Sequence, residues 1–324
     1  MSKISFTRCL FITGFAMFAA LPQAWSQAWP AKQISVTVGL QAGAGSYVAV
    51  RDIAEKLGTA LGQNVVVTSV PGAAGLLAAQ QVAKVAPDGY NLVALSGATV
   101  TTLPLMLKNF TPMRDLIPVA MIVSFPSVLS VNSKVPAANI REFLELTRKN
   151  PGKYTYASGG NGSVQHTAME SLKHMAKIDL LHVPYKGMAQ ATTDLVGGQV
   201  DAAIQGVVAV IPFAKTGQVR VLAWTGTQRN PLYPDLPTLA EAGITGYQFQ
   251  SWTALFAPAG TPRDVVARLN AEIRKIATSA ELRDRWIPQA MESMDLIPAQ
   301  IDKLIRDDSQ QMERMIKETG LKLE

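Results

Sequence analysis

Short segments rich in Val and Ile alternate with helical segments along most of the 324-residue chain, and this alternation restricts the fold more than any other feature. Residues 34–39 and 65–68 have the composition of buried strands, and residues 50–61 between them carry apolar side chains at helical spacing. A second helix is expected over residues 76–85, followed by a strand over residues 90–95. Because strands that alternate with helices of about 10–15 residues form βαβ units, we expect open α/β sheets.

The second half of the chain repeats this style without repeating the sequence. It contains expected strands at residues 154–157, 181–184, 200–204 and 219–224, with expected helices at residues 164–176 and 189–196. Further on, Thr261 is expected to cap a long helix that has Pro262 at its first position and Asp264 at its third. The pattern therefore indicates two α/β halves followed by a C-terminal helical segment.

The first 28 residues have the pattern of a secretory signal peptide. Lys3 and Arg8 precede an apolar stretch over residues 10–21, and small residues then occupy the spacing of a cleavage site. The apolar stretch is shorter than the roughly 18 residues that a membrane anchor needs. We therefore expect export to the periplasm with cleavage, which would also remove Cys9, the single cysteine of the sequence.

Composition and histidine spacing exclude several classes of protein. A hydrophobic fraction of 48% with 17% charged residues is that of a globular chain rather than of a disordered one. The 30 Lys and Arg residues are scattered and stand against 24 acidic residues, which argues against nucleic acid as a partner. His166, His174 and His182 are eight residues apart, and this spacing does not form the i, i+4 pair of a metal-binding helix. We expect neither a metal nor another cofactor.

Nucleotide-binding and hydrolase motifs are incomplete in this chain. Gly43 and Gly45 resemble the start of a dinucleotide-binding loop, but Val48 stands at the position of its third glycine. Neither a P-loop nor a G-x-S-x-G elbow occurs. An exported hydrolase that uses Ser163 and His166 stays open as a remote alternative, although a serine at the start of a helix more often caps that helix.

Two short, polar, glycine-rich loops carry the functional signal. Residues 41–46 lie between the first strand and the first helix, and residues 158–163 occupy the equivalent place in the second half. Each loop leaves backbone N–H groups at a helix start, where the helix dipole also favours an anion. Facing each other across a cleft, two such loops would clamp a carboxylate without catalytic groups. Either loop alone is also what a tight strand-to-helix turn requires.

A series of short motifs, in a fixed order along the chain, is similar to that of a known family. The motifs are Trp29-Pro-x-Lys32, Pro71-Gly-Ala-Ala-Gly75, Ala86-Pro-Asp-Gly-Tyr90, Tyr156-Ala-Ser-Gly-Gly-Asn-Gly-Ser163 with His166, Val183-Pro-Tyr-Lys-Gly187, Gly198-Gln-Val-Asp201, Leu236-Pro-Thr-Leu-Ala-Glu-Ala-Gly243 and Ala257-Pro-Ala-Gly-Thr-Pro262. With them the chain resembles the Bug-type substrate-binding proteins of tripartite tricarboxylate transporters.

The resemblance implies an α/β, two-lobed periplasmic-binding-protein fold (Venus-flytrap, type II-like) with two crossover strands. Residues 29–126 and 251–324 would form lobe 1, and residues 127–250 would form lobe 2. The implied protein is a monomeric receptor, not an enzyme, that closes on a small carboxylate and delivers it to membrane transporter subunits. A periplasmic sensor that presents its closed form to a signalling partner would look the same and stays open as an alternative.

Two positions depart from the family pattern. Tyr47 stands where the family usually has an acidic residue before the first helix, and residues 102–105 replace a common Asn-Pro. An acidic residue before the first helix can pair with a ligand ammonium group, whereas a phenol offers a hydroxyl and a flat apolar face. We therefore expect a ligand without an amino group, with aromatic acids among the candidates.

The expected ligand-binding residues follow from the two loops and the resemblance together. From lobe 1 they are Gly43, Ala44, Gly45, Ser46, Tyr47, Ser96 and Thr99, with Trp252 near the second crossover as an aromatic wall or a core residue. From lobe 2 they are Ser158, Gly160, Asn161, Gly162, Ser163, His166, Tyr185, Lys186, Gln205 and Gly206. Among these, His166 is expected to orient its loop, and Lys186 either adds charge to the cleft or is solvated. Asp201 is expected to be structural.

Overall fold

The computed structural model describes residues 29–42, 45–107, 111–161, 163–231 and 233–319. The expected signal peptide over residues 1–28 lies outside these ranges, as do Gly43, Ala44 and Gly162 of the expected site. Within them, no helix is both long enough and apolar enough to span a membrane.

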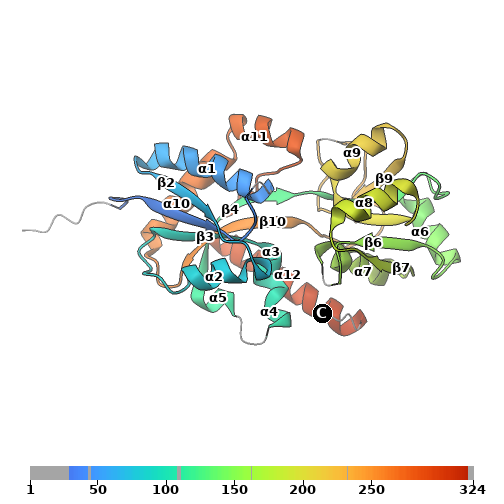
Figure 1. The fold of residues 1–324 in the computed structure, drawn as a ribbon, viewed down its shortest axis with the longest axis horizontal. Helices are drawn as coiled ribbons and strands as arrows, with labels where there is room; N and C mark the ends of the chain where they lie inside the picture. Colours follow the sequence, from blue (N-terminus) through green and yellow to red (C-terminus); the bar gives the residue numbers. More distant parts are fainter. Residues whose placement is uncertain (1–28, 43–44, 108–110, 162, 232, 320–324) are drawn as a thin grey trace, which may run out of the picture.

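Two five-stranded mixed sheets organise the chain (Figure 1). The first has the order β2(Val65–Ser69), β1(Ile34–Val38), β3(Asn91–Ser96), β10(Ser251–Pro258) and β4(Leu116–Phe125). The second has the order β7(Leu181–Pro184), β6(Thr155–Ser158), β8(Ala202–Gly206), β5(Ser127–Asn132) and β9(Val219–Trp224). Among the expected strands, β1 pairs in parallel with β2 and β3, and β6 pairs in parallel with β7 and β8. The expected strand β9 instead pairs antiparallel with β5, and β10 and β5 run antiparallel to both of their neighbours. We call the first sheet with its helices the first lobe, and the second sheet with its helices the second lobe.

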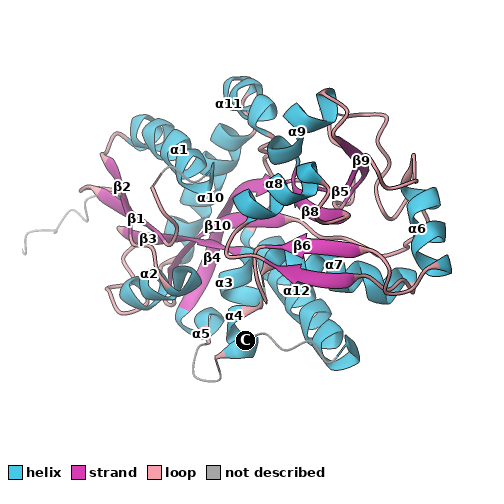
Figure 2. Ribbon diagram, turned by 45° about the vertical axis from the view of Figure 1, so that its right-hand side comes forward, coloured by secondary structure: helices cyan, strands magenta, loops and turns pink. Residues whose placement is uncertain are grey.

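The helices cover both faces of each sheet (Figure 2). They are α1(Gly45–Leu61), α2(Leu76–Val82), α3(Gly97–Thr101), α4(Leu103–Met106), α5(Pro112–Asp115), α6(Ile140–Lys149), α7(Val164–Ala176), α8(Met188–Gly197), α9(Val207–Lys215), α10(Arg263–Ala277), α11(Ala280–Trp286) and α12(Pro298–Thr319), with 3₁₀ turns η1(Ala73–Gly75) and η2(Ile287–Gln289). The expected start of α10 was wrong by one residue. Its N-cap is Pro262, and the Thr261 hydroxyl donates to the Pro258 carbonyl (2.8 Å) instead of capping the helix.

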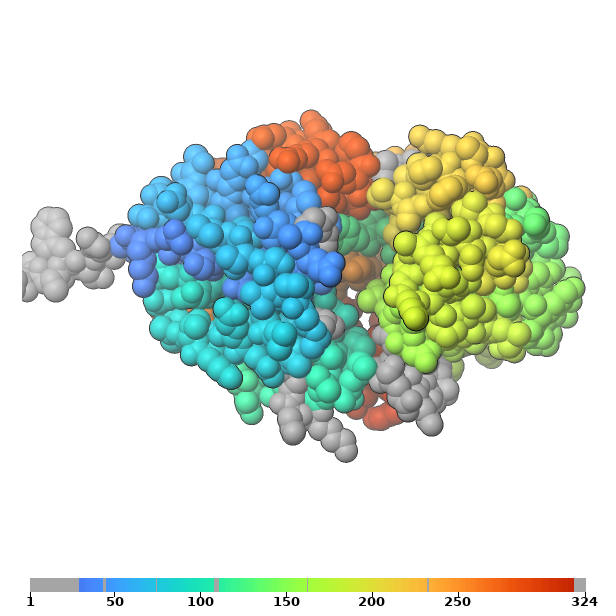
Figure 3. Space-filling view, viewed as in Figure 1, coloured from blue at the N-terminus to red at the C-terminus, as the bar shows by residue number. Residues whose placement is uncertain are grey.

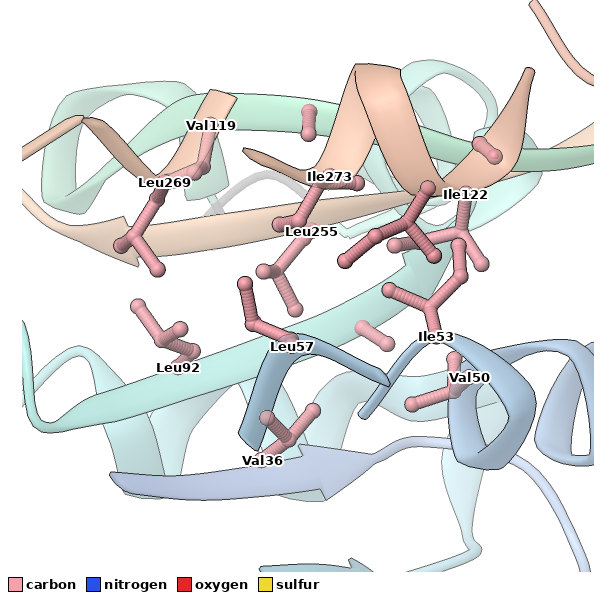
Figure 4. Packing of buried hydrophobic residues seen from close by; sticks show 14 of the residues in the cluster. Val36, Val50, Ile53, Leu57, Leu92, Val119, Ile122, Leu255, Leu269 and Ile273 are labelled. Carbon is pink, nitrogen blue, oxygen red and sulfur yellow. The ribbon is translucent and has the colours of Figure 1, made fainter. Parts of the chain in front are cut away.

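The core of the first lobe shows why the helical spacing in the sequence was informative. Val50, Ile53 and Leu57 of α1 point toward Leu269 and Ile273 of α10 over the sheet, and all five are buried (Figure 4). On the opposite face, α2, α3 and α12 bury a second apolar cluster against the same sheet. Burial on both faces matches the continuous Val and Ile runs of these strands.

The chain passes between the lobes twice. It leaves β4 through Pro126 to enter β5, and it returns after β9 to enter β10, the strand that lies between β3 and β4. The C-terminal helix α12 contacts α3 and β4 of the first lobe and α7 of the second. Thus α12 bridges the lobes in addition to the two chain crossings.

Candidate ligand-binding site

A cleft separates the two lobes in the space-filling view (Figure 3). Between the lobes and α12 lies a cavity of about 390 Å³, within the range of about 300–1,000 Å³ that is common for small-molecule sites. The starts of α3 and α7, the crossover residues 248–252 and α12 form its walls. Much of the lining is apolar, including Val164, Phe249, Trp252, Met294, Leu296 and Met315. Among the described residues of the expected site, Ser96 and Trp252 line this cavity.

The start of α1 is held against the crossing strand. The Ser46 hydroxyl lies 2.8 Å from the hydroxyl of Thr253 in β10, and both side chains are buried. A Cβ atom at Gly45 would stand 2.9 Å from Cε1 of Phe125, so the close approach of backbone and ring requires glycine. Tyr47 is half-buried and packs against the core of the first lobe. The start of α1 is therefore supported from the side of the crossover.

The start of α3 is supported by the same strand. Ser96 is the N-cap, and its hydroxyl accepts a hydrogen bond from the Thr99 amide (3.4 Å). A Cβ atom at Gly97 would stand 2.6 Å from Cε2 of Trp252, so this helix start packs directly on the indole. Trp252 and Thr99 are 3% and 1% exposed, so both contribute mainly to packing.

Trp252 also links the crossover to the C-terminal helix. Its indole N–H donates to Oδ2 of Asp308 in α12 (3.0 Å). Burial raises the pKa of Asp308 to about 6, with a further increase from neighbouring Asp307, while the hydrogen bond from Trp252 acts in the opposite direction. The sequence carried no signal for this contact, because 56 residues separate its two members.

The loop of the second lobe is a tight turn closed by its own serine. The Ser158 hydroxyl contacts both the amide and the carbonyl of Gly160, each at 3.1 Å. Gly160 has φ +117°, a conformation that L-residues rarely adopt. Ser163 caps α7 by accepting from the His166 amide (3.3 Å). This is the capping role that the sequence favoured over a catalytic serine. The backbone N–H groups of the first turn of α7 have no partners within the helix, because no helical turn precedes them.

Two histidines that the sequence did not bring together stack behind this loop. The rings of His166 and His182 lie 4.0 Å apart at 8°, and the Tyr156 ring stacks with both, at 4.8 Å from His182 and 6.4 Å from His166. Nε2 of His182 lies 2.6 Å from the Ser158 hydroxyl. Burial lowers the pKa of His182 to about 4, with a further decrease from His166, and burial also lowers the pKa of His166. His166 is 5% exposed, in keeping with a role in orienting the loop.

The remaining expected residues divide between supporting and exposed positions. The Gln205 side chain is buried between Thr192 (2.6 Å) and Ser130 (3.3 Å), and the Tyr185 hydroxyl donates to Asp194 (2.8 Å). Three other residues of the set are exposed, namely Asn161, Lys186 and Gly206. Outside this set, Asp201 accepts from the amide and hydroxyl of Thr155 and has the structural role expected of it.

Within the part of the chain that the structure describes, no group of three or more His, Cys, Asp or Glu side chains is arranged to hold a metal ion. The described site instead combines helix starts from two lobes with a largely apolar cavity. Such a combination suits an organic anion, since helix starts favour negative charge and apolar walls favour the carbon skeleton.

Comparison with known families decides between the possible classes. The model of the tripartite tricarboxylate transporter family receptor matches residues 49–321. The chain belongs to this family. The receptor is 30% identical over 325 residues to Protein BugT of Bordetella pertussis, an alignment that covers 99% of the receptor and 100% of BugT.

Solved structures agree with this assignment. A structure from R. palustris with adipate shares 30% identity and a TM-score of 0.74, covering 90% of the receptor and 99% of that chain. MatC from Rhodopseudomonas palustris with bound malate shares 30% identity and a TM-score of 0.69, covering 89% and 99%. The expected family and the two-lobed α/β fold are therefore confirmed. The protein is an extracytoplasmic solute receptor of the tripartite tricarboxylate transporter family.

Proposed function

We propose that this receptor acts in the periplasm as a monomer and binds a small carboxylate that lacks an amino group. The observation that carries the proposal is the meeting of two helix starts from opposite lobes at one apolar cavity. Ser96 and Gly97 at α3, and Val164 at α7, all line that cavity. Backbone N–H groups at such positions favour a carboxylate without supplying a group that could react with it.

Side chains at the start of α1 and along α12 support the exclusion of an amino group. Tyr47 occupies the position at which an acidic residue would pair with a ligand ammonium. The two carboxylates that line the cavity already have partners, since Asp308 accepts from Trp252 and Asp307 pairs with Lys303 in α12. An ammonium group left without a partner in the closed site costs on the order of a few kcal/mol. Adipate and malate, found in two structural relatives, also lack an amino group.

We assign different tasks to the expected site residues. Ligand contact is assigned to the helix starts, at Gly45, Ser96 and Ser163 with the amides that follow them. Thr99 and Gln205, which are buried and hydrogen-bonded within the protein, are assigned to the support of those segments. Trp252 is assigned the apolar wall of the cavity, where the carbon skeleton of the ligand would pack.

Ligand capture in this proposal requires movement of the lobes. We place the hinge at residues 126–127 and 250–251, where the chain passes between the two sheets. Lobe 1 then comprises residues 29–126 and 251–324, and lobe 2 comprises residues 127–250. Because the two sets of donors belong to different lobes, hinge closure brings them to one ligand. Small-angle scattering should give a smaller radius of gyration with a bound acid than without it.

Calorimetry with matched acids tests the proposal. The pairs succinate and aspartate, glutarate and glutamate, adipate and 2-aminoadipate, and phenylacetate and phenylglycine each differ by one amino group. The amino-free member of the best-binding pair is expected to bind about a hundredfold more tightly, which corresponds to about 2.7 kcal/mol. Equal or tighter binding of the amino acid would contradict the proposal.

The variant Tyr47→Asp provides the matched change on the protein. A carboxylate at this position should weaken binding of the amino-free acid by charge repulsion. It should also recover part of the affinity for the corresponding amino acid. If Tyr47→Asp leaves both affinities unchanged while the circular dichroism spectrum is preserved, the assignment of Tyr47 to ligand selection is wrong.

A further inference from the structure

The hydroxyl of Ser158 has three polar neighbours and one hydrogen atom to share among them. The Gly160 amide donates to it (3.1 Å), the Gly160 carbonyl lies 3.1 Å away, and Nε2 of His182 lies 2.6 Å away. The side chain is fully buried, so water does not replace a missing partner at low cost. The number of donors and acceptors therefore restricts the state of the histidine.

Only one assignment satisfies all three contacts. A serine hydroxyl donates once and accepts twice. The carbonyl of Gly160 can only accept. The Ser163 amide also donates to it (3.1 Å), but its contact with Ser158 is a hydrogen bond only if the Ser158 hydroxyl hydrogen is directed to it. Both lone pairs then receive donors, one from the Gly160 amide and one from His182. Nε2 of His182 must accordingly carry a hydrogen atom.

We propose that His182 is a positioning residue that donates from Nε2–H to Ser158 and thereby fixes the turn before α7. The ligand-related part of this inference rests on the proposed function, since that turn sets the direction of the α7 start. His182 acts through Ser158 and does not itself contact the ligand. Ser158 is likewise a support, because its hydroxyl is fully used within the loop.

The surroundings of His182 hold the neutral ring in this orientation. His166 and Tyr156 both stack against it, with ring centroids 4.0 Å and 4.8 Å away, and Tyr156 is in turn anchored to Glu170 through its hydroxyl (2.6 Å). Lys173 pairs with Glu170 (2.9 Å), so the nearby charged groups neutralise each other. A neutral ring with hydrogen on Nε2 leaves Nδ1 as an acceptor, and this tautomer is directly observable.

Nuclear magnetic resonance tests the tautomer without any ligand. Long-range ¹H–¹⁵N correlation spectra of the full receptor at neutral pH should show His182 with a protonated Nε2 and an unprotonated Nδ1. The opposite tautomer would force Ser158 to donate to His182, leave the Gly160 carbonyl without that donor, and overturn the proposal. His174, exposed on α7, provides an internal reference in the same spectra.

Amide exchange and a double-mutant cycle test the positioning role. His182→Phe keeps an aromatic ring for the stack but lacks the donor, and it should speed exchange of the Gly160 amide about tenfold, the factor expected for one lost hydrogen bond. Ser158→Ala should do the same, and the double variant should exceed neither single variant. Additive effects, or an unchanged Gly160 amide in His182→Phe, would overturn the proposal.

The ligand arm separates this inference from the proposed function. For the best-binding acid of the matched panel, His182→Phe should lower the affinity about tenfold while denaturant unfolding still shows one cooperative transition. If no acid of the panel binds, the proposed ligand class fails, while tautomer and exchange still decide the role of His182. Unchanged affinity together with a disturbed Gly160 amide would contradict the positioning role.

Discussion

The helix starts of the two lobes serve one interlobe space but are held in different ways. In the first lobe, both helix starts rest on β10: Ser46 contacts the hydroxyl of Thr253 at 2.8 Å, and Gly97 packs on the ring of Trp252. In the second lobe, the turn at Ser158 is tied to His182 on the neighbouring strand β7. The first lobe thus uses the strand that enters from the crossover, and the second uses only its own sheet.

This difference indicates how each half would respond to hinge movement. A change in the path of β10 reaches the starts of α1 and α3 directly, and reaches α12 through the Trp252–Asp308 hydrogen bond. The turn of the second lobe has no such connection among the described contacts, so it should move with its lobe as a rigid body.

Gly160→Val should break the second-lobe turn. The φ of +117° strains a β-branched residue, and the new Cβ would stand 3.2 Å from the carbonyl oxygen of Tyr185. We expect at least a hundredfold loss of affinity, measured by calorimetry, with the overall fold retained; this corresponds to about 2.7 kcal/mol. Gly197→Val, at an exposed helix end with no atom within 4 Å of the new Cβ, is the matched control. Unchanged affinity in Gly160→Val would remove this turn from the site.

Asp308→Asn should remove the pH dependence of stability that the buried Asp308 carboxyl in α12 causes. Because burial raises the pKa of Asp308 to about 6, its contribution to stability is fully present below about pH 4 and is lost as pH rises through about 6. The shift corresponds to roughly 3 kcal/mol. Relative to wild type, Asp308→Asn should therefore gain free energy of unfolding between pH 4 and pH 7 in urea titrations. A difference that does not change with pH would contradict burial of this carboxyl.

Gly97→Ala should test the packing of α3 on the crossing strand. The added Cβ would stand 2.6 Å from the Trp252 ring, and overpacking of this kind costs about 1–3 kcal/mol. The smaller ring of Trp252→Phe should reduce that cost, so the two substitutions together should be less destabilising than the sum of their separate effects. Additive unfolding free energies would show that the indole is not the obstacle.

Ser46→Ala should give the smallest effect. Loss of its hydrogen bond with Thr253 is expected to lower the free energy of unfolding by about 1 kcal/mol. Thr253→Val, which removes the partner hydroxyl with little change of shape, should cost a similar amount. In a double-mutant cycle, the free energy of unfolding of the double variant should be little lower than that of either single variant. Full additivity of the two effects would argue against a direct link between α1 and β10.

The sequence was sufficient for the features that depend on local patterns. Val and Ile runs located the strands, and helical spacing located the buried face of α1. Ser163 was correctly expected to favour capping, since a polar residue directly before a helix satisfies its free amides. The ligand-binding roles of the expected site residues stay predictions until a bound acid is observed.

Features that depend on contacts between distant segments were missed. His166 and His182 meet because β7 lies beside β6, whose end leads into α7, and no sequence periodicity records that proximity. The Trp252–Asp308 contact likewise exists only because α12 returns across the lobes. The cap of α10 was placed one residue early because Thr261 satisfies the Pro258 carbonyl, a choice set by the preceding turn.

The position of Trp252 gives the receptor an optical reporter of its own state. Of the four tryptophans in the described chain, Trp252 is the one that lines the interlobe cavity, whereas Trp224 and Trp286 are buried within a single lobe. Closure around a ligand alters the polarity around an indole at the cavity and leaves buried Trp224 and Trp286 as a steady background. Fluorescence titration of the unlabelled protein can therefore rank acids by affinity, through changes in the wavelength and intensity of tryptophan emission.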